Sequence, residues 1–243
     1  MPKLLLLGGT TEANALARSL AERGTNAVYS YAGRVDNPRP QPLPVRVGGF
    51  GGVDGLAGYI RDNAITHVVD ATHPFAAKMS ANAIAACNAA DVPLTALTRS
   101  AWSPQQGDSW QHVPDIPAAV AALDGPARRV FLAVGRMHLR DFAAQPQHHY
   151  LLRLVDEPET VLLPNAGIVV SRGPFTVEDD VALMKNHGTE LVVSKNAGGT
   201  GARAKLDAAR TLNVPVLMID RPSLPSRQEL SSVDQVLDWL THS

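Results

Sequence analysis

The stretch that decides the fold is LLLLGGTTE, residues 4–12. Its four leucines form a continuous apolar run, which is the pattern of a strand buried on both faces. A glycine turn follows directly, and Ala13, Leu16 and Leu20 then recur at helical spacing up to Gly24, a natural helix C-cap. Strand, glycine turn and helix in this order predict the first unit of a parallel α/β sheet.

The same alternation continues along the chain. Apolar runs of strand length recur at residues 27–31, 43–47, 66–70, 93–97, 130–134, 168–171, 190–194 and 214–219. Segments with helical spacing are expected at residues 53–60, 75–90, 118–123, 177–187, 202–212 and 233–240. Strands that alternate with helices predict parallel, doubly wound sheets.

An irregular, proline-containing stretch at residues 99–126 interrupts this alternation. We interpret it as the crossing between two lobes. The predicted fold class is therefore α/β, with two Rossmann-like lobes, parallel sheets and a cleft between them. The expected domains are residues 1–125, which bind a dinucleotide, and residues 126–243, which bind the substrate.

Composition excludes several classes of protein. The 243 residues carry 22 basic and 23 acidic side chains, a formal charge of −1, so no global field favours nucleic acid or an anionic membrane. The leucine run is too short to span a membrane. One cysteine, Cys87, allows neither an internal disulfide nor a multi-cysteine metal site, and is expected to be a small buried apolar residue. We expect a cytoplasmic protein without a metal, and favour a monomer although the sequence does not fix the oligomeric state.

The first glycine turn is a candidate anion site, because a helix N-terminus presents unpaired N–H groups and a positive dipole end. Gly8 permits the tight turn, Gly9 allows a pyrophosphate to approach the backbone, and the hydroxyls of Thr10 and Thr11 can add donors. Glu12 completes the motif, which departs from the G-x-G-x-x-G fingerprint. A tight turn without a ligand is the alternative interpretation.

The end of the second expected strand indicates which dinucleotide would bind. NAD enzymes usually place an acid roughly 20 residues past the first glycine, to hold the ribose 2′-hydroxyl. This chain has Ser30, Gly33 and Arg34 in that region and no carboxylate at residues 30–34. A guanidinium and a hydroxyl suit a 2′-phosphate, which favours NADPH. Alternatively, Arg34 is a solvated loop residue.

A second candidate region follows the strand at residues 66–70, at its carboxyl end, where open α/β sheets bind ligands. Thr72 and Pro74 are candidate contacts of the cofactor. His73 is a candidate proton donor, and an equally good alternative is that it only shapes the cofactor site.

The second half carries another strand followed by a glycine-rich turn. Glycines and cations in such a turn suit carboxylates as well as phosphates. No Gly-Lys-Ser/Thr follows, so this is not the P-loop of nucleotide triphosphatases. The candidate substrate-binding residues are Arg136, Lys195, Asn196, Gly198, Gly199, Thr200, Gly201 and Lys205, and Lys195 is also a catalytic candidate. Alternatively, Lys205 and Arg203 are surface residues of a helix, with Arg203 paired to Asp207.

Taken together, several motifs resemble the precorrin-6A reductases of cobalamin biosynthesis over nearly the whole chain. The matching segments are LLGGTTE at 6–12, DATHPFA at 70–76, Thr98-Arg99 with Trp102, SKNAGG at 194–199, Lys205, and PVLMIDRP at 215–222. The resemblance implies two Rossmann-like domains, no metal or flavin, and the NADPH-dependent reduction of one carbon–carbon double bond of precorrin-6A to give precorrin-6B.

Two other classes of protein remain open on the residues alone. A dinucleotide-sensing regulator without turnover would not need the second anion site at residues 195–205. A non-redox, two-lobed tetrapyrrole enzyme would not need the first glycine turn together with Arg34.

Overall fold

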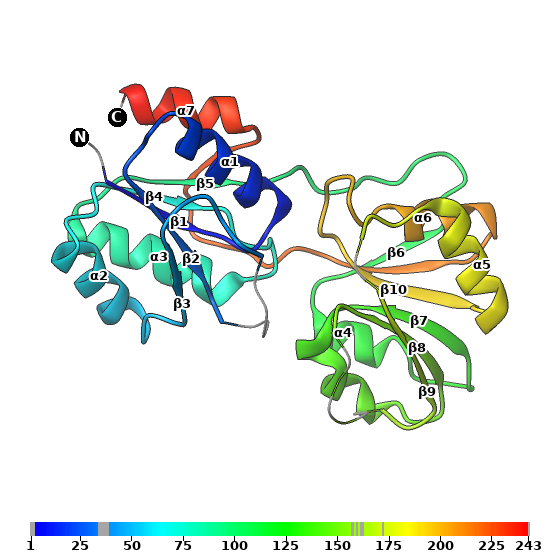
Figure 1. Cartoon of the computed structure of the whole chain (residues 1–243). Helices are drawn as coiled ribbons and strands as arrows, with labels where there is room; N and C mark the ends of the chain where they lie inside the picture. Colours follow the sequence, from blue (N-terminus) through cyan, green and yellow to red (C-terminus); the bar gives the residue numbers. More distant parts are fainter. Residues whose placement is uncertain are drawn as a thin grey trace. The chain divides into compact units, whose positions relative to one another are not determined.

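The computed structural model describes residues 3–33, 39–156, 158, 160, 163–171 and 173–242. Within them the chain forms two compact units, each built on a six-stranded parallel sheet with helices on its faces (Figure 1). The predicted α/β fold with two parallel-sheet lobes is confirmed.

The first unit has the strand order β12-β5-β4-β1-β2-β3. Its strands are β1 (Leu4–Leu7), β2 (Ala27–Tyr31), β3 (Val45–Val47), β4 (His67–Asp70), β5 (Leu94–Leu97) and β12 (Gln228–Leu230). Its helices are α1 (Thr11–Glu22), α2 (Val53–Asp62), α3 (Ala77–Ala90) and α7 (Val233–His242). The order reverses between β1 and β4, and ligands bind at such switch points in doubly wound sheets.

The four leucines of β1 build the core on both faces of this sheet. Leu4 and Leu6 pack with α1 and α7 on one face, and Leu5 and Leu7 pack with α2 and α3 on the other. Figure 1 shows these two helix layers on opposite sides of the strands. Burial on both faces explains why the run is apolar at every position rather than at alternate ones.

Cys87 of α3 belongs to this core, as expected from the sequence. It is 1% exposed, and burial raises the pKa of its thiol to about 12. The group is therefore a protonated, packed side chain at neutral pH.

The second unit has the strand order β6-β11-β10-β7-β8-β9. Its strands are β6 (Trp110–Val113), β7 (Arg129–Ala133), β8 (His149–Leu154), β9 (Ala166–Val170), β10 (Leu191–Lys195) and β11 (Val216–Ile219). Its helices are α4 (Ile116–Ala121), the 3₁₀ helix η1 (Arg136–Ala144), α5 (Val177–His187) and α6 (Ala204–Thr211). Here the switch point lies between β7 and β10.

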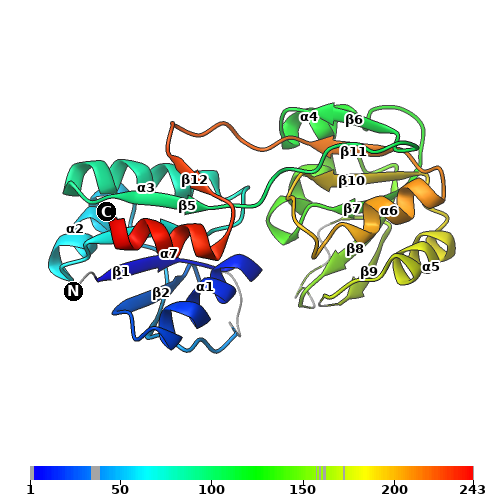
Figure 2. The same ribbon diagram turned by 90° about the horizontal axis from the view of Figure 1, so that it is seen from above.

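Each sheet receives its last strand from an unexpected part of the chain. β6 follows β5 in sequence but pairs with β11 in the second unit, and β12 follows β11 but pairs with β5 in the first (Figure 2). The units are therefore residues 1–100 with 223–243, and residues 101–222. This division corrects the expected boundary at residues 125 and 126. Strand pairing depends on contacts between residues far apart in the sequence, so local sequence patterns do not predict it.

Several elements also differ from the sequence expectation. The strands β6, β8 and β12 were not expected, and α3 begins at Ala77 rather than at residue 75 because residues 73–76 form a tight turn with a bond from Ala76 N–H to His73 O. β6 and β12 are short edge strands with few buried side chains, so they lack a clear apolar pattern.

Helix caps are predicted well. The hydroxyl of Thr176 accepts a hydrogen bond from Asp179 N–H at 3.1 Å, which opens α5 as the capping pattern predicts. Ser232 caps α7 in the same way through Gln235 N–H, at 3.2 Å.

Candidate functional site

The glycine turn between β1 and α1 is built around Tyr29. A Cβ on Gly8 would lie 2.2 Å from the Tyr29 ring, so only glycine fits there. The Tyr29 hydroxyl accepts a hydrogen bond from Gly9 N–H at 2.9 Å and donates one to Asn14 Oδ1 at 2.9 Å. Sequence reasoning missed Tyr29 and Asn14, because only the fold brings them beneath the turn.

This arrangement limits which groups of the turn can bind an anion. Gly9 N–H is occupied by Tyr29, and the Thr10 hydroxyl donates to Ala71 O at 2.8 Å while accepting from Ala13 N–H. The expected role of the Thr10 hydroxyl as a donor to the ligand is therefore not what the structure shows. The backbone N–H groups of Thr10, Thr11 and Glu12 have no acceptor in the described part of the chain.

Gly9 leaves room above these N–H groups. Its φ is +119°, and a Cβ placed on it would meet no atom within 4 Å. Open space beside three unpaired N–H groups at a helix N-terminus fits a phosphate.

A cation accompanies the acidic side chain at this site. Glu12 forms an ion pair with Arg99 at 2.8 Å, although the two residues are 87 positions apart. The pairing neutralises a carboxylate that would otherwise repel an anion at the start of α1. Arg99 entered the sequence analysis only through the family resemblance, and its partner carries no local signal.

The end of β2 is connected to the end of β3. Ser30 is buried, and its hydroxyl accepts a hydrogen bond from Arg46 Nη1 at 2.8 Å. Gly33 has a φ of +74° and lies near Gly48 of the loop after β3. Arg34, the expected cation, lies outside the described residues. Arg46 is a residue that the sequence analysis missed.

The loop after β4 is fixed by a buried carboxylate. Asp70 accepts bonds from Thr72 N–H and Oγ1 at 3.1 and 2.7 Å, from Ser80 Oγ at 2.6 Å, and from Arg227 Nη1 at 2.5 Å. The Thr72 hydroxyl is thus directed inward toward Asp70. Arg227 precedes β12, so the returning segment is tied to this loop.

His73 and Pro74 belong to the loop after β4, which starts beside the glycine turn. Ala71 N–H bonds to Leu7 O at 2.9 Å, which keeps the loop after β4 beside the end of β1. His73 is exposed, and its Nδ1 accepts from Phe75 N–H at 3.2 Å, which leaves Nε2 to carry the proton of the neutral ring.

In the second unit, two predicted cations lie at neighbouring strand ends. Ser194 pairs with Ala133 across β10 and β7, so Lys195, the last residue of β10, and Arg136, the first residue of η1, lie at the same edge of the sheet. Lys195 is half-buried and Arg136 is exposed. These are the strands that flank the switch point of this sheet.

The turn after β10 is fixed by hydrogen bonds to Trp102 and Arg221. The Asn196 side chain bonds both backbone groups of Trp102, at 2.7 and 3.0 Å, and the Trp102 indole donates to Gly199 O at 2.6 Å. Arg221 donates to the carbonyls of Asn196 and Ala197. Asn196 therefore shapes the turn, whereas Thr200 and Gly201 are exposed.

Lys205 is also an internal residue. It is 5% exposed, its ammonium donates to Ala202 O at 2.6 Å, and it lies 4.8 Å from the centre of the Trp102 ring. The helix-surface interpretation is therefore wrong for Lys205. For Arg203 the expected pairing with Asp207 is confirmed, at 3.4 Å.

Buried charges lie below this turn. Asp180 is 2% exposed and pairs with Arg153, which stacks on Phe175 at 3.8 Å. Burial raises the pKa of the Asp180 carboxyl, and the charges of Arg153 and Lys205 oppose that rise.

Two classes of site are not found. No group of three or more histidine, cysteine or acidic side chains in the described residues is arranged to hold a metal ion. No helix in that part of the chain is long and apolar enough to cross a membrane.

Two doubly wound parallel sheets, each with a glycine-rich turn beside its switch point, define a protein of the Rossmann-like class. Residues 3–241 match the model of the precorrin-6x reductase CbiJ/CobK family, and the chain belongs to that family.

Named relatives match nearly the whole chain. It is 58% identical over 241 residues to the precorrin-6A reductase of Rhodobacter capsulatus, which covers 99% of this chain and 96% of the relative. It is 45% identical to the precorrin-6A reductase of Rhodococcus erythropolis, with 97% and 95% covered. A solved structure described as CobK precorrin-6A reductase is similar with a TM-score of 0.95 at 57% identity, with 100% and 97% covered.

Proposed function

We propose that this chain is a precorrin-6A reductase that uses NADPH to reduce one carbon–carbon double bond of precorrin-6A, giving precorrin-6B in cobalamin biosynthesis. The observation that carries the proposal is the 58% identity to a precorrin-6A reductase along essentially the whole chain. We further propose that it acts as a cytoplasmic monomer.

The first unit holds the cofactor in this proposal. The N–H groups of Thr10, Thr11 and Glu12 bind the pyrophosphate, with Gly9 providing the open approach. Ser30 and Gly33 face the adenosine ribose, for which Arg34 is the cation that the sequence offers, and the loop with Thr72 and Pro74 borders the nicotinamide end. NADPH supplies the hydride, so the protein contributes binding and alignment.

The second unit holds the macrocycle. Its acetate and propionate groups are anions, and Lys195 and Arg136 present cations at adjacent strand ends. Gly198, Gly199, Thr200 and Gly201 form the rest of the site, with positive φ values of 71° and 72° at the first two glycines. Asn196 and Lys205 support it by fixing Trp102 and the turn.

Reduction of the double bond needs a hydride on one carbon and a proton on the other. His73 is the candidate donor in the first unit, because its Nε2 carries the ring proton and its side chain is exposed. Lys195 is the candidate in the second unit.

The test is anaerobic incubation of the purified protein with precorrin-6A and NADPH, while the absorbance of both is followed. We expect both to be consumed in a 1:1 ratio. Binding of NADPH without consumption would contradict the proposal and favour a dinucleotide-sensing regulator. Conversion of the tetrapyrrole without loss of NADPH would favour a non-redox enzyme.

A further inference from the structure

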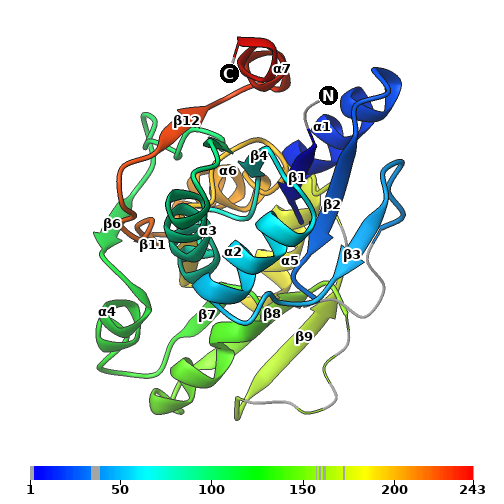
Figure 3. The same cartoon turned by 90° about the vertical axis from the view of Figure 1, so that its left-hand side faces the viewer.

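A second arginine occupies the edge of the sheet where the adenosine ribose is expected. Arg46 lies on β3, directly opposite Ser30 of β2, and Figure 3 shows these two strands side by side at the edge of the first unit. The glycine turn follows β1, which is the next strand beyond β2. A dinucleotide that starts at this turn and extends across β2 therefore reaches Arg46.

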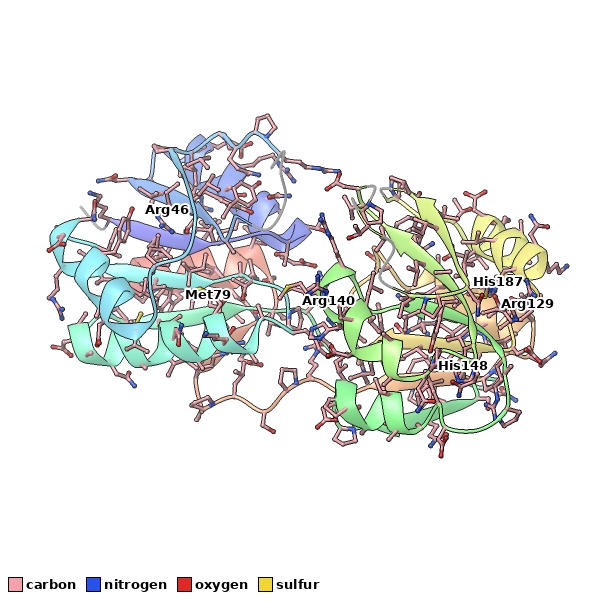
Figure 4. The ribbon with its side chains drawn as sticks, turned by 90° about the horizontal axis from the view of Figure 1, so that it is seen from below. Arg46, Met79, Arg129, Arg140, His148 and His187 are labelled. Atoms are coloured by element: carbon pink, nitrogen blue, oxygen red, sulfur yellow. The ribbon has the colours of Figure 1, made fainter. Side chains whose placement is uncertain are left out.

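The guanidinium of Arg46 is fixed in place before any ligand arrives. Nη1 donates to Ser30 Oγ at 2.8 Å and to Gly48 O at 2.9 Å, and Nη2 donates to Gly49 O at 3.1 Å. The guanidinium carbon, Cζ of Arg46, lies 3.8 Å from the centre of the Phe50 ring, which stacks against the guanidinium. Figure 4 labels Arg46 in the first unit. A rigid guanidinium loses little side-chain entropy on binding.

Arg46 keeps donors for a further partner. A guanidinium has five N–H groups, and these three bonds leave Nε–H and one Nη2–H without an acceptor in the described residues. A Cβ on Gly48 or Gly49 would meet no atom within 4 Å, so the loop leaves space beside the group. Burial also lowers the pKa of Arg46, a sign that the charge has lost part of its water.

We propose that Arg46, held by Ser30 and Phe50, is a specificity-determining residue that binds the 2′-phosphate of NADPH. This inference rests on the proposed function, because it assumes that a dinucleotide binds at the first glycine turn. A charge-assisted contact to the 2′-phosphate favours NADPH over NADH, which lacks that group.

The experiment compares Arg46→Gln with the wild type by fluorescence titration with NADPH and NADH, and by calorimetry with adenosine 2′,5′-bisphosphate. Loss of a charge-assisted contact weakens binding by about ten- to a hundredfold. We expect that loss for NADPH and the bisphosphate, with NADH affinity nearly unchanged. Arg61→Gln, at an exposed arginine of α2, is the matched control and should leave all three affinities unchanged.

Three outcomes would overturn this assignment. Equal losses for NADPH and NADH would mean that Arg46 only holds the loop after β3. Unchanged NADPH affinity in Arg46→Gln would show that Arg46 does not bind the 2′-phosphate. A wild-type protein that binds neither dinucleotide would instead refute the proposed function, and the inference with it. Thermal unfolding of each variant, and of Arg46→Lys as a variant that keeps the positive charge, establishes that the compared proteins are folded.

Discussion

Gly8 and Gly9 stand side by side, but the structure requires each of them for a different reason. Gly8 is required by packing, because the Tyr29 ring occupies the space of any side chain. Gly9 is required by its left-handed backbone and by the open space above it. Substitution of Gly8 should therefore lower the stability of the fold, whereas substitution of Gly9 should interfere with binding of the proposed ligand.

Gly9→Val should abolish NADPH binding while the first unit stays folded, because the side chain enters the proposed pyrophosphate site. The backbone strain should cost about 1–3 kcal/mol of unfolding free energy. Gly24→Val is the matched control, since Gly24 also has a positive φ of +65° and open space around it, but lies at the other end of α1. NADPH titration and urea unfolding distinguish the two, and normal binding by Gly9→Val would place the phosphate elsewhere.

At the scale of elements, the ends of parallel strands position the chemistry. The glycine turn and His73 follow the neighbouring strands β1 and β4, and Arg136 and Lys195 lie at the ends of the neighbouring strands β7 and β10. In both units the strands that carry these residues are the two that flank the switch point of the sheet.

Lys195→Ala should weaken binding of precorrin-6A by about ten- to a hundredfold, because one charge-assisted contact is lost. NADPH affinity should stay nearly unchanged. The control is Lys185→Ala, which removes an exposed cation of α5. Titrations at increasing salt concentration should show weaker precorrin-6A binding, since salt screens the attraction. Impaired NADPH binding with normal tetrapyrrole binding would contradict the assignment of ligands to units.

The end of α5 should respond to acid. Burial lowers the pKa of His187, and the charge of Arg129, whose Nε donates to His187 O, lowers it further; Figure 4 shows these two residues together. The folded state therefore disfavours the charged ring, whereas the unfolded chain takes up a proton near pH ~6.5. The stability contributed by neutral His187 is present above that pH and is lost as the pH falls.

His187→Asn should remove this dependence. We expect the free energy of unfolding of the wild type to fall between pH 7.5 and 5.5 by more than that of the variant, measured with urea. Parallel losses in the two proteins would show that His187 does not contribute.

At the scale of the whole molecule, each sheet depends on a strand from a distant part of the chain. β12 and α7 complete the first unit, where Val236 and Leu237 of α7 are buried against α1. Arg227 also neutralises buried Asp70. The last 21 residues are thus part of the proposed cofactor-binding unit, although they follow the second unit in sequence.

Deletion of residues 223–243 should therefore unfold or destabilise the first unit and spare the second. Burial of each large apolar side chain contributes about 1.5–3 kcal/mol, and the deletion also leaves Asp70 unpaired. Hydrogen exchange should show lost protection in β1 and β4 and retained protection in β7 and β10. A shortened chain that protects β1 and binds NADPH normally would contradict this dependence.

Much of the fold was accessible to sequence reasoning, because buried parallel strands are continuously apolar and helices carry their caps locally. The strand at Leu4–Leu7, the caps at Thr176 and Ser232, and the pairing of Arg203 with Asp207 needed only neighbours within a few residues. The edge strands β6 and β12 lacked that signal.

The candidate site likewise contains residues that the sequence indicates and residues that only the structure reveals. Gly9, Lys195 and the glycines after β10 stand out in the sequence, since glycines and cations that follow strands are local patterns. Tyr29 beneath Gly9, Arg99 on Glu12, and Arg46 on Ser30 do not, because each contact joins segments that meet only in the folded sheet.

The sequence by itself determined the α/β class, the two glycine turns and the family resemblance, because these depend on local spacing and residue type. Only the tertiary structure decided that β6 joins the second sheet and β12 the first, and that Asn196 and Lys205 face inward. The physical reason is that strand pairing and side-chain burial are long-range contacts, selected by the free energy of the whole packed chain.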